Sequence, residues 1–361
     1  MIHFFIGTKA QFIKMVPIIV ELNNRQIPYK YIDSGQHADL TSVMRKTFGI
    51  HEPDICLHQG RDITSVFAAI TWTCKLMLIT LFARNRIKHV IFPEGGICLI
   101  HGDTLSTLLG LRMAKAAGLK VAHVEAGLRS FNIFHPFPEE LIRIYCMKRC
   151  DLLFSPSDSA YENLRRMKIK GEIINVDGNT VVDSLRLVQN IKTTINIPQI
   201  PFVLASCHRL ETITQRRKLQ QVVNLFNDVA KTIKVVFVTH KPTRKYLEKF
   251  GLLDKISDDI KIMGMQDYMN FTALMKSANM VFADGGSIQE ECAYLNKPCL
   301  ILRHKTERPD GIGKNAVLWN FDKRNAAKFI KIYSEYDSGQ HNYHPYPSKK
   351  IIDMLVKRNS I

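Results

Sequence analysis

Two acidic residues, Asp103 and Glu125, each follow a short apolar segment in the first half of the chain. The preceding segments, residues 97–100 and 119–122, have the continuous apolar character of buried parallel strands. Open α/β sheets bind their ligands beyond the carboxyl ends of such strands. Two carboxyl groups delivered to that edge are candidates for general acid–base chemistry, in which a proton is taken up and returned.

The chain between these acids predicts the element that positions them. Residues 104–117 have the pattern of a helix, and Gly118 stands where a helix C-terminus favours glycine. The β-α-β unit therefore places both acids at one end of neighbouring strands. Asp103 has a second explanation, because an acid often caps the helix that follows it. Glu125 precedes Ala-Gly-Leu-Arg, which offers no such capping role and favours a functional one.

Strand-like and helix-like segments alternate from the first residue to about residue 321, which is the pattern of parallel sheets with crossover helices. A length of 361 residues also exceeds what one hydrophobic core usually supports. We therefore expect a first domain over 1–190, a linker over 191–201, a second domain over 201–335, and a tail over 336–361 that packs on the first domain. Strands are expected at residues 2–6, 29–32, 89–92, 98–100, 121–124, 152–154, 173–176, 202–205, 235–238, 260–262, 280–283 and 299–302.

The composition favours an anionic ligand. The chain has 50 lysines and arginines against 33 acids, for a formal net charge of +17. These cations are scattered, and no RNA-binding or helix-turn-helix pattern accompanies them. Most of these charges are therefore expected to lie on the solvated surface; as a ligand, a polyanionic small molecule such as a nucleotide diphosphate is expected, and no nucleic acid.

Other features of the sequence predict a cytoplasmic protein. Its eight cysteines form no CxxC pair, and a predicted strand follows Met1 at once, which leaves no room for a signal peptide. Residues 63–83 have the length of a membrane-spanning helix, but Lys75 near the centre would be costly in lipid. We predict a long buried helix there and no stable membrane insertion.

A glycine-rich turn in the second half could bind phosphate. The run Asp284-Gly285-Gly286-Ser287 follows the apolar segment 280–283, and a helix is expected to begin at Ile288. Glycines at this place let backbone N–H groups approach an anion at the helix N-terminus. The alternative is a simple turn in which Ser287 caps the helix and Glu290 completes a capping box.

Several motifs occur in a fixed order along the chain: Phe5-Ile6-Gly7-Thr8-Lys9-Ala10, Ile13-Lys14-Met15, Gly35-Gln36-His37, His101-Gly102-Asp103-Thr104, His123-Val124-Glu125-Ala126-Gly127-Leu128-Arg129, Pro138-Glu139-Glu140, Asp177-Gly178-Asn179-Thr180-Val181-Val182-Asp183, His208-Arg209, Ile288-Gln289-Glu290-Glu291 and Thr306-Glu307-Arg308-Pro309. Together they resemble the UDP-N-acetylglucosamine 2-epimerase family, from residue 2 to about residue 319. The resemblance implies an α/β fold of the GT-B type, with two Rossmann-like domains and a central cleft.

The resemblance also implies a reaction. A base removes the proton from the sugar C2, UDP leaves C1 to give a 2-acetamidoglucal, and readdition of UDP with protonation on the other face gives UDP-N-acetylmannosamine for surface polysaccharides. It implies Asp103, Glu125 and Glu139 as the acid–base carboxylates and His208 as a catalytic group of the second domain. Which carboxylate performs which step stays open. No cofactor or metal is implied, and a homodimer is a further expectation.

The same resemblance implies the groups that bind the UDP-sugar. Among them Glu291 matches the acid that holds the ribose hydroxyls, and the cations match positions near the diphosphate or the sugar. The implied binding residues are Lys9, Lys14, Gln36, His37, Arg143, Arg209, Gly285, Gly286, Ser287, Glu291 and Arg308.

The chain departs from the family pattern at three places. Lys9 stands where the family has arginine, so the charge remains but the bidentate fork is lost. The run 284–287 replaces Asp-Ser-Gly-Gly, and residues 311–315 differ from the commoner continuation. Ala10 slightly favours a hydrolysing relative that releases UDP and free N-acetylmannosamine, whereas Pro138-Glu139-Glu140 favours the non-hydrolysing type. A GT-B glycosyltransferase, which would not need three such acids, and a non-catalytic nucleotide-sugar-binding protein are further alternatives.

Overall fold

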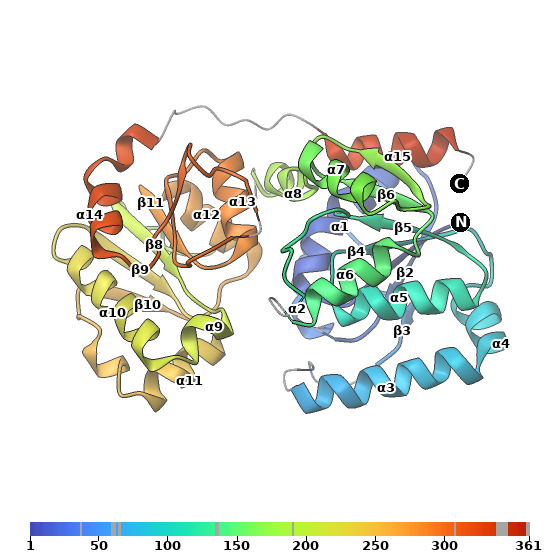
Figure 1. Ribbon diagram of the computed structural model, residues 1–361, viewed down its shortest axis with the longest axis horizontal. Coiled ribbons are helices and arrows are strands. Elements are labelled where there is room, and N and C mark those ends of the chain that lie inside the picture. Colours follow the sequence, from blue (N-terminus) through green and yellow to red (C-terminus); the bar gives the residue numbers. More distant parts are fainter. Residues whose placement is uncertain are drawn as a thin grey trace. The chain divides into compact units, whose positions relative to one another are not determined.

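The computed structural model describes residues 1–36, 38–58, 63, 66–133, 137–189, 191–306, 308–336 and 346–358. The chain forms two compact units (Figure 1). Unit 1 comprises Met1–Ser184 with His344–Ile361, and unit 2 comprises Leu185–Tyr343. Each unit is a parallel sheet with interleaved helices, so the predicted α/β class with two Rossmann-like sheets is confirmed.

The sheet of unit 1 has the order β3-β2-β1-β4-β5-β6-β7, and all of its pairings are parallel. The strand order reverses between β1 and β4, which makes that point the topological switch of a doubly wound sheet. Its strands are β1 (Ile2–Ile6), β2 (Tyr29–Asp33), β3 (Ile55–Cys56), β4 (Ile97–His101), β5 (Lys120–Val124), β6 (Leu152–Ser155) and β7 (Glu172–Asn175). The helices of this part of the chain are α1 (Lys9–Asn24), α2 (Ala38–Thr47), α3 (Val66–Phe82), α4 (Arg84–Arg86), α5 (Leu105–Ala116), α6 (Glu139–Met147), α7 (Asp158–Arg166), α8 (Val181–Val188) and α15 (Pro347–Lys357).

The sheet of unit 2 repeats this topology with the order β10-β9-β8-β11-β12-β13, and its switch point lies between β8 and β11. Its strands are β8 (Phe202–Ser206), β9 (Lys234–Val238), β10 (Ile260–Met263), β11 (Met280–Ala283), β12 (Cys299–Ile301) and β13 (Ala316–Leu318). Its helices are α9 (Leu210–Ile213), α10 (Arg216–Ala230), α11 (Lys241–Lys249), α12 (Tyr268–Ser277), α13 (Gly286–Tyr294) and α14 (Lys323–Lys331), with short 3-10 turns at Leu253–Lys255 and Tyr333–Tyr336.

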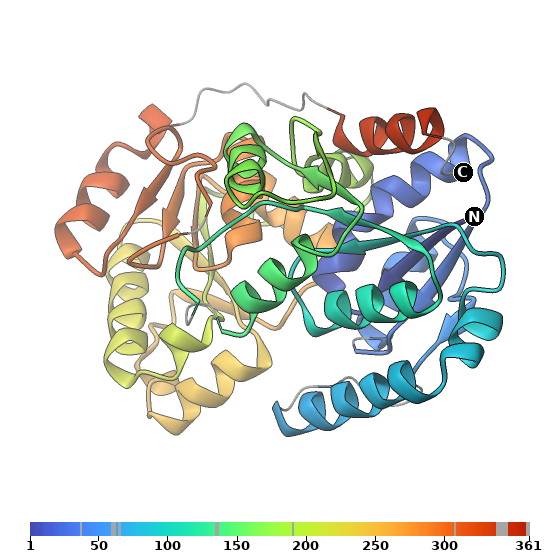
Figure 2. The same ribbon diagram turned by 45° about the vertical axis from the view of Figure 1, so that its right-hand side comes forward.

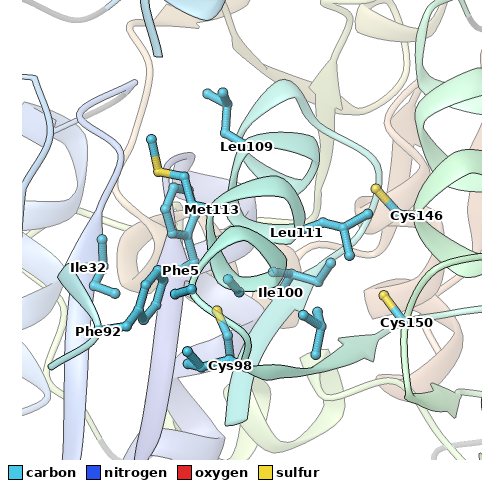
Figure 3. Close-up of a cluster of buried hydrophobic side chains, with 14 of the residues drawn as sticks. Phe5, Ile32, Phe92, Cys98, Ile100, Leu109, Leu111, Met113, Cys146 and Cys150 are labelled. Atoms are coloured by element: carbon cyan, nitrogen blue, oxygen red, sulfur yellow. The ribbon is translucent and has the colours of Figure 1, made fainter. Parts of the chain in front are cut away.

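The core of unit 1 lies where α5 packs on the central strands (Figure 3). Leu109 and Met113 of α5 are fully buried together with Phe5 of β1 and with Cys98 and Ile100 of β4. Helix α5 begins where Thr104 accepts a hydrogen bond from the backbone N–H of Thr107. It ends before Gly118, whose φ of +82° suits the left-handed helix terminus. The predicted helix between the two acids is therefore confirmed.

Two expectations for the region before β4 were wrong. Residues 89–92 were expected to form a strand, but Ile87–Ile91 is a π-helical turn, because a short apolar run does not distinguish the two structures. The segment expected to be a long buried helix is α3, which buries only one face. Trp72 and Leu76 pack into the core, whereas Phe82 is 84% exposed.

The C-terminal helix α15 packs beside α1 in unit 1 (Figures 1 and 2). Ion pairs fasten it there: Asp353 accepts from Arg25 of α1 at 2.6 Å, and Lys350 donates to Asp177 at 2.5 Å. Within the described ranges, no helix combines the length and the apolar character needed to cross a membrane.

Candidate active site

Asp103 and Glu125 lie at the carboxyl edge of the unit 1 sheet, beside its switch point. The pairing of His101 with Val124 aligns the ends of β4 and β5, and the two acids follow those ends. The N-cap of α5 is Thr104, so the capping explanation for Asp103 is wrong. His123 and Arg143 each experience the charges of both acids, which shows that the two carboxylates share one environment. Burial lowers the pKa of His123 to about 4, and its Nε2 atom lies 2.7 Å from the Gly102 carbonyl oxygen.

Asp103 belongs to a buried ion-pair network. Arg143 of α6 donates through Nη2 to Asp103 and through Nη1 to Glu140, the latter at 2.8 Å. Glu140 also accepts from the Arg129 side chain and the Ser130 backbone. Burial alone would raise the pKa of Glu140, but these donors and charges outweigh it and lower the pKa. Arg143, expected near the diphosphate or the sugar, is thus already shared between two carboxylates.

Glu125 is held by groups from three other segments. Its Oε2 atom accepts from Lys14 of α1 and from the Asn179 side chain, and His101 Nε2 lies 3.9 Å away. Glu125 adopts a φ of +66°, a left-handed conformation that costs about 1 kcal/mol or more outside glycine. Only 9% of its side chain is exposed, so the ion pair with Lys14 forms in a largely water-free place. The predicted cation Lys14 therefore acts on Glu125 in this structure.

Glu139 differs from the other two acids in its partners. It opens α6, one turn before Arg143, so its position on the helix faces the same side as that arginine. Its Oε2 atom is buried and has no hydrogen-bond partner in the part of the chain that the structure describes. An ionised oxygen in that position is costly unless a ligand, a water or a proton satisfies it. Glu139 is therefore the acid whose buried Oε2 atom can still accept a hydrogen bond.

The loop after β1 supports this edge of the sheet. Gln11 accepts from the N–H groups of Gly7 and Thr8 at 3.0 and 3.1 Å and donates to the His101 carbonyl at 2.8 Å, which joins the ends of β1 and β4. A Cβ on Gly7 would lie 2.0 Å from Ser34 Oγ, so only glycine fits there.

The remaining predicted binding residues of unit 1 lie at or near the same edge. Gln36 accepts through Oε1 from Ser106 Oγ at 2.7 Å. Lys9 is the half-buried first residue of α1. His37 lies outside the described residues.

Unit 2 brings a second set of groups to its own switch point. The pairing of Ser206 with Ala283 aligns the ends of β8 and β11. Asp284, just beyond β11, is fully buried and accepts from the backbone N–H groups of His208 and Arg209 at 2.9 and 2.8 Å. The predicted residues His208, Arg209, Gly285 and Gly286 are therefore neighbours in space.

Helix α13 begins earlier than the sequence suggested. It starts at Gly286 with Gly285 as the N-cap and without a side-chain cap. The alternative in which Ser287 caps this helix with Glu290 does not occur, because two glycines already let the chain enter the helix. The first N–H groups of the helix therefore depend on something other than a capping side chain. Such a terminus is suited to an anion.

Further along α13, a loop is fastened by side-chain bonds. Gln289 donates to the carbonyl groups of Arg308 and Asp310 at 3.0 and 2.8 Å, and Arg308 donates to Glu290 at 2.7 Å. The predicted ribose-binding acid Glu291 is 4% exposed. Burial and the charge of Glu291 raise the pKa of Tyr268 well above its ordinary value.

Several residues of these two sets were not singled out from the sequence. Gln11, Asn179, Glu140 and Asp284 lie inside the quoted motifs or in the opening that departs from the family pattern, but their contacts join segments far apart in the chain. His240 follows strand β9, and its ring stacks on His208 with centroids 4.5 Å apart. The rule that ligands bind beyond strand ends would have pointed to His240.

Known proteins resemble this chain over nearly its whole length. A family model described as UDP-N-acetylglucosamine 2-epimerase matches residues 20–352. The chain belongs to this family. A relative from Bacillus subtilis named UDP-N-acetylglucosamine 2-epimerase is 31% identical over 376 residues, which cover 97% of this chain and 93% of the relative.

Solved structures extend the match to the fold of this epimerase-family chain. A Neisseria meningitidis UDP-GlcNAc 2-epimerase bound to UDP-GlcNAc is 26% identical, covers 99% of both chains and gives a TM-score of 0.84. A Methanocaldococcus jannaschii UDP-GlcNAc 2-epimerase in complex with UDP-GlcNAc and UDP is also 26% identical, covers 99% of both chains and gives a TM-score of 0.83. The sequence-based assignment to a family of isomerases is thus confirmed.

Proposed function

We propose that this protein epimerises UDP-N-acetylglucosamine at C2 to UDP-N-acetylmannosamine by elimination and readdition of UDP. The observation that carries the proposal is that Asp103 and Glu125 follow neighbouring strand ends of the unit 1 sheet, and that Arg143 ties α6, which begins at Glu139, to Asp103. A C2–H bond is a weak acid, so its cleavage needs a base that is already positioned. In this proposal UDP-sugar is the substrate, as for the relatives whose structures contain it.

The partners of the three acids suggest a division of labour. Asp103 pairs with Arg143 and Glu125 pairs with Lys14, so each is suited to orienting the sugar and stabilising positive charge. Glu139 has a buried oxygen without a partner among the described residues, so it is the acid best suited to remove the C2 proton. We therefore assign removal of the C2 proton to Glu139. Inversion at C2 needs a proton delivered to the opposite face of the sugar, so a second group must act as the acid, and Asp103 and Glu125 are the candidates.

Unit 2 supplies the groups suited to the departing diphosphate. The uncapped start of α13 at Gly286 presents backbone N–H groups, and Arg209 and His208 follow β8 at the same switch point. Negative charge that develops on UDP as the C1–O bond breaks is stabilised by such donors. Lys9, Gln36, Ser287, Glu291 and Arg308 remain proposed binding residues on the strength of the family match. His37, which lies outside the described residues, is proposed on the same basis.

The product identity tests this proposal. The protein is incubated with UDP-N-acetylglucosamine, and the mixture is followed by proton and phosphorus NMR. We expect an epimeric nucleotide sugar with the diphosphate ester intact at equilibrium. Accumulation of free N-acetylmannosamine and UDP would instead establish the hydrolysing reaction, and binding without any turnover would establish a nucleotide-sugar-binding protein. In this proposal UDP-N-acetylmannosamine serves as a sugar donor for surface polysaccharide. We also propose a cytoplasmic location, because the eight free cysteines suit a reducing compartment.

We further propose that the protein forms a homodimer through α3, which lies along the outside of unit 1 beside α5 (Figure 1). Apart from Lys75 and its threonines the helix is apolar, and Ile70, Leu78 and Leu81 are each more than 50% exposed. Ile70 and Leu78 are equally spaced from the exposed Cys74 at the middle of α3. A two-fold axis near Cys74 would therefore pair Ile70 with Leu78 of the partner subunit in an antiparallel contact.

The native cysteine provides the test of this interface. Cys74 is the one fully exposed cysteine of the chain, so mild oxidation should join two copies through it. We expect a covalent dimer from the wild type and none from the Cys74→Ser variant. Leu78→Glu should shift the mass measured by light scattering towards the monomer. A monomeric wild type would contradict the proposal.

A further inference from the structure

The structure fixes the surroundings of the His208 side chain. Its Nδ1 atom lies 3.3 Å from Asp284 Oδ1, and the Asp284 side chain is fully buried. The other carboxylate oxygen, Oδ2, accepts from the backbone N–H groups of His208 and Arg209 at 2.9 and 2.8 Å. The His208 N–H also lies 3.0 Å from Oδ1, so both carboxylate oxygens of Asp284 accept from backbone N–H groups.

Neighbouring groups also restrict the rotation of the His208 ring. His240 stacks on one face with an angle of 28° between the rings and 4.5 Å between their centroids. Gly285 closes the edge near Cε1, since a Cβ on Gly285 would lie 3.0 Å from that atom. Asp284, His240 and Gly285 thus constrain the Nδ1 side, one face and the Cε1 edge. The His208 side chain is 33% exposed, so part of the ring remains accessible.

The carboxylate decides which ring nitrogen of His208 carries the hydrogen. His208 Nδ1 does not meet hydrogen-bond geometry among the described residues, but its 3.3 Å contact with a carboxylate oxygen favours a hydrogen on Nδ1, and Nε2 of the neutral ring then keeps its lone pair. We infer that Asp284 is a positioning residue that holds His208 as the Nδ1–H tautomer and presents Nε2 to the substrate. Nε2 can then take up a proton and return it, or donate to the diphosphate oxygen when protonated. This use of His208 rests on the proposed function.

The Asp284→Asn variant replaces one acceptor oxygen with a donor NH₂ group and keeps a side chain of the same size. Oδ2 accepts from the backbone N–H groups of both His208 and Arg209, whereas Oδ1 accepts only from that of His208, so the amide oxygen is favoured at the Oδ2 position and the amide nitrogen at the Oδ1 position. That NH₂ group would face Nδ1 as a donor and would force Nδ1 to become an acceptor. The tautomer of His208 should therefore switch to Nε2–H.

The primary test measures the tautomer directly in the full-length protein. Long-range ¹H–¹⁵N spectra at alkaline pH, where imidazole is neutral, distinguish the two nitrogens. The His208→Gln variant assigns the signal. We expect the Nδ1–H form in the wild type and in the His240→Phe control, which keeps an aromatic ring against His208. We expect the Nε2–H form in Asp284→Asn. An Nε2–H signal in the wild type, or an unchanged tautomer in Asp284→Asn, would overturn the inference.

Kinetics separate this inference from the proposed function. A histidine held in the wrong tautomer loses roughly 10²- to 10⁴-fold in kcat in comparable dyads, so Asp284→Asn should lower kcat while KM for the UDP-sugar changes little. A purely structural role would lower the unfolding midpoint without a switch of tautomer. If the wild type does not turn over UDP-sugar but shows the Nδ1–H form and its reversal, the proposed function fails and the positioning by Asp284 stands.

Discussion

The contribution of the buried ion pair between Lys14 and Glu125 to the stability of unit 1 can be measured. Both side chains are nearly inaccessible, with 4% and 9% exposed, so neither charge is well solvated when its partner is removed. Removing one member of a buried pair costs about 3–5 kcal/mol. Asn179 still donates to Glu125 in Lys14→Met, so we expect the lower end, about 3 kcal/mol. With a urea m-value of about 2 kcal/mol per molar, the midpoint should fall by roughly 1.5 M.

The double variant Lys14→Met/Glu125→Gln provides the decisive comparison. It removes both charges and retains an oxygen that accepts from Asn179, so no unpaired buried charge remains. We expect its stability to lie within about 1 kcal/mol of the wild type, so that the second substitution recovers about 2–3 kcal/mol of the loss in Lys14→Met. The exposed pair of Lys350 and Asp177 gives the control, because Lys350→Met should cost less than about 1 kcal/mol.

The chain offers one fluorescent reporter for each unit. Its two tryptophans are Trp72 in α3 of unit 1 and Trp319 in unit 2, and both are buried. In a Trp319→Phe background, urea unfolding followed by Trp72 fluorescence reports on unit 1 alone. The reasoning is refuted if Lys14→Met shifts the midpoint no more than Lys350→Met does. It is also refuted if the double variant is as unstable as Lys14→Met.

Three further predictions use the same readouts. The lowered pKa of His123, about 4 against about 6.5 when unfolded, means that the unfolded chain takes up the proton first, so unit 1 loses stability as pH falls from 6.5 towards 4. His123→Gln should flatten that decline by up to about 3 kcal/mol. Glu140 has a lowered pKa, so its contribution to the stability of unit 1 is present above about pH 4.3 and is lost as pH falls through the folded-state pKa. Glu140→Gln should therefore be less stable than the wild type at pH 7, and this difference in stability should shrink in acid. Gly7→Ala should cost about 2 kcal/mol or more because of its clash with Ser34, whereas Gly264→Ala, with no atom within 4 Å, should be nearly neutral.

The sequence predicted the parts of this fold that depend on local patterns. The apolar segments before Asp103 and Glu125 are strands β4 and β5, and the helix between them runs as expected from its periodicity and from Gly118. The strand expected at 89–92 was a helical turn, since its apolar residues fit either structure. The start of α13 also differed, because a serine near two glycines resembles a cap even when the glycines already begin the helix.

The sequence could not give the pairings that distinguish the three acids. Lys14 and Asn179 reach Glu125 from segments more than fifty positions away, so no spacing rule brings them together. Arg143 pairs with both Asp103 and Glu140, a contact that its place in the sequence did not reveal. Such contacts depend on the order of strands in the sheet, which places the ends of β1, β4 and β5 at one edge.

The central claim is that Glu139 transfers the proton at the sugar C2. The most direct test is the rate at which solvent deuterium enters C2 of UDP-N-acetylglucosamine, compared between the wild type and Glu139→Gln, with UDP affinity measured alongside. The account predicts rapid exchange in the wild type, and exchange reduced by about 10²-fold or more in the variant with UDP binding retained. Exchange at the wild-type rate in Glu139→Gln would contradict it.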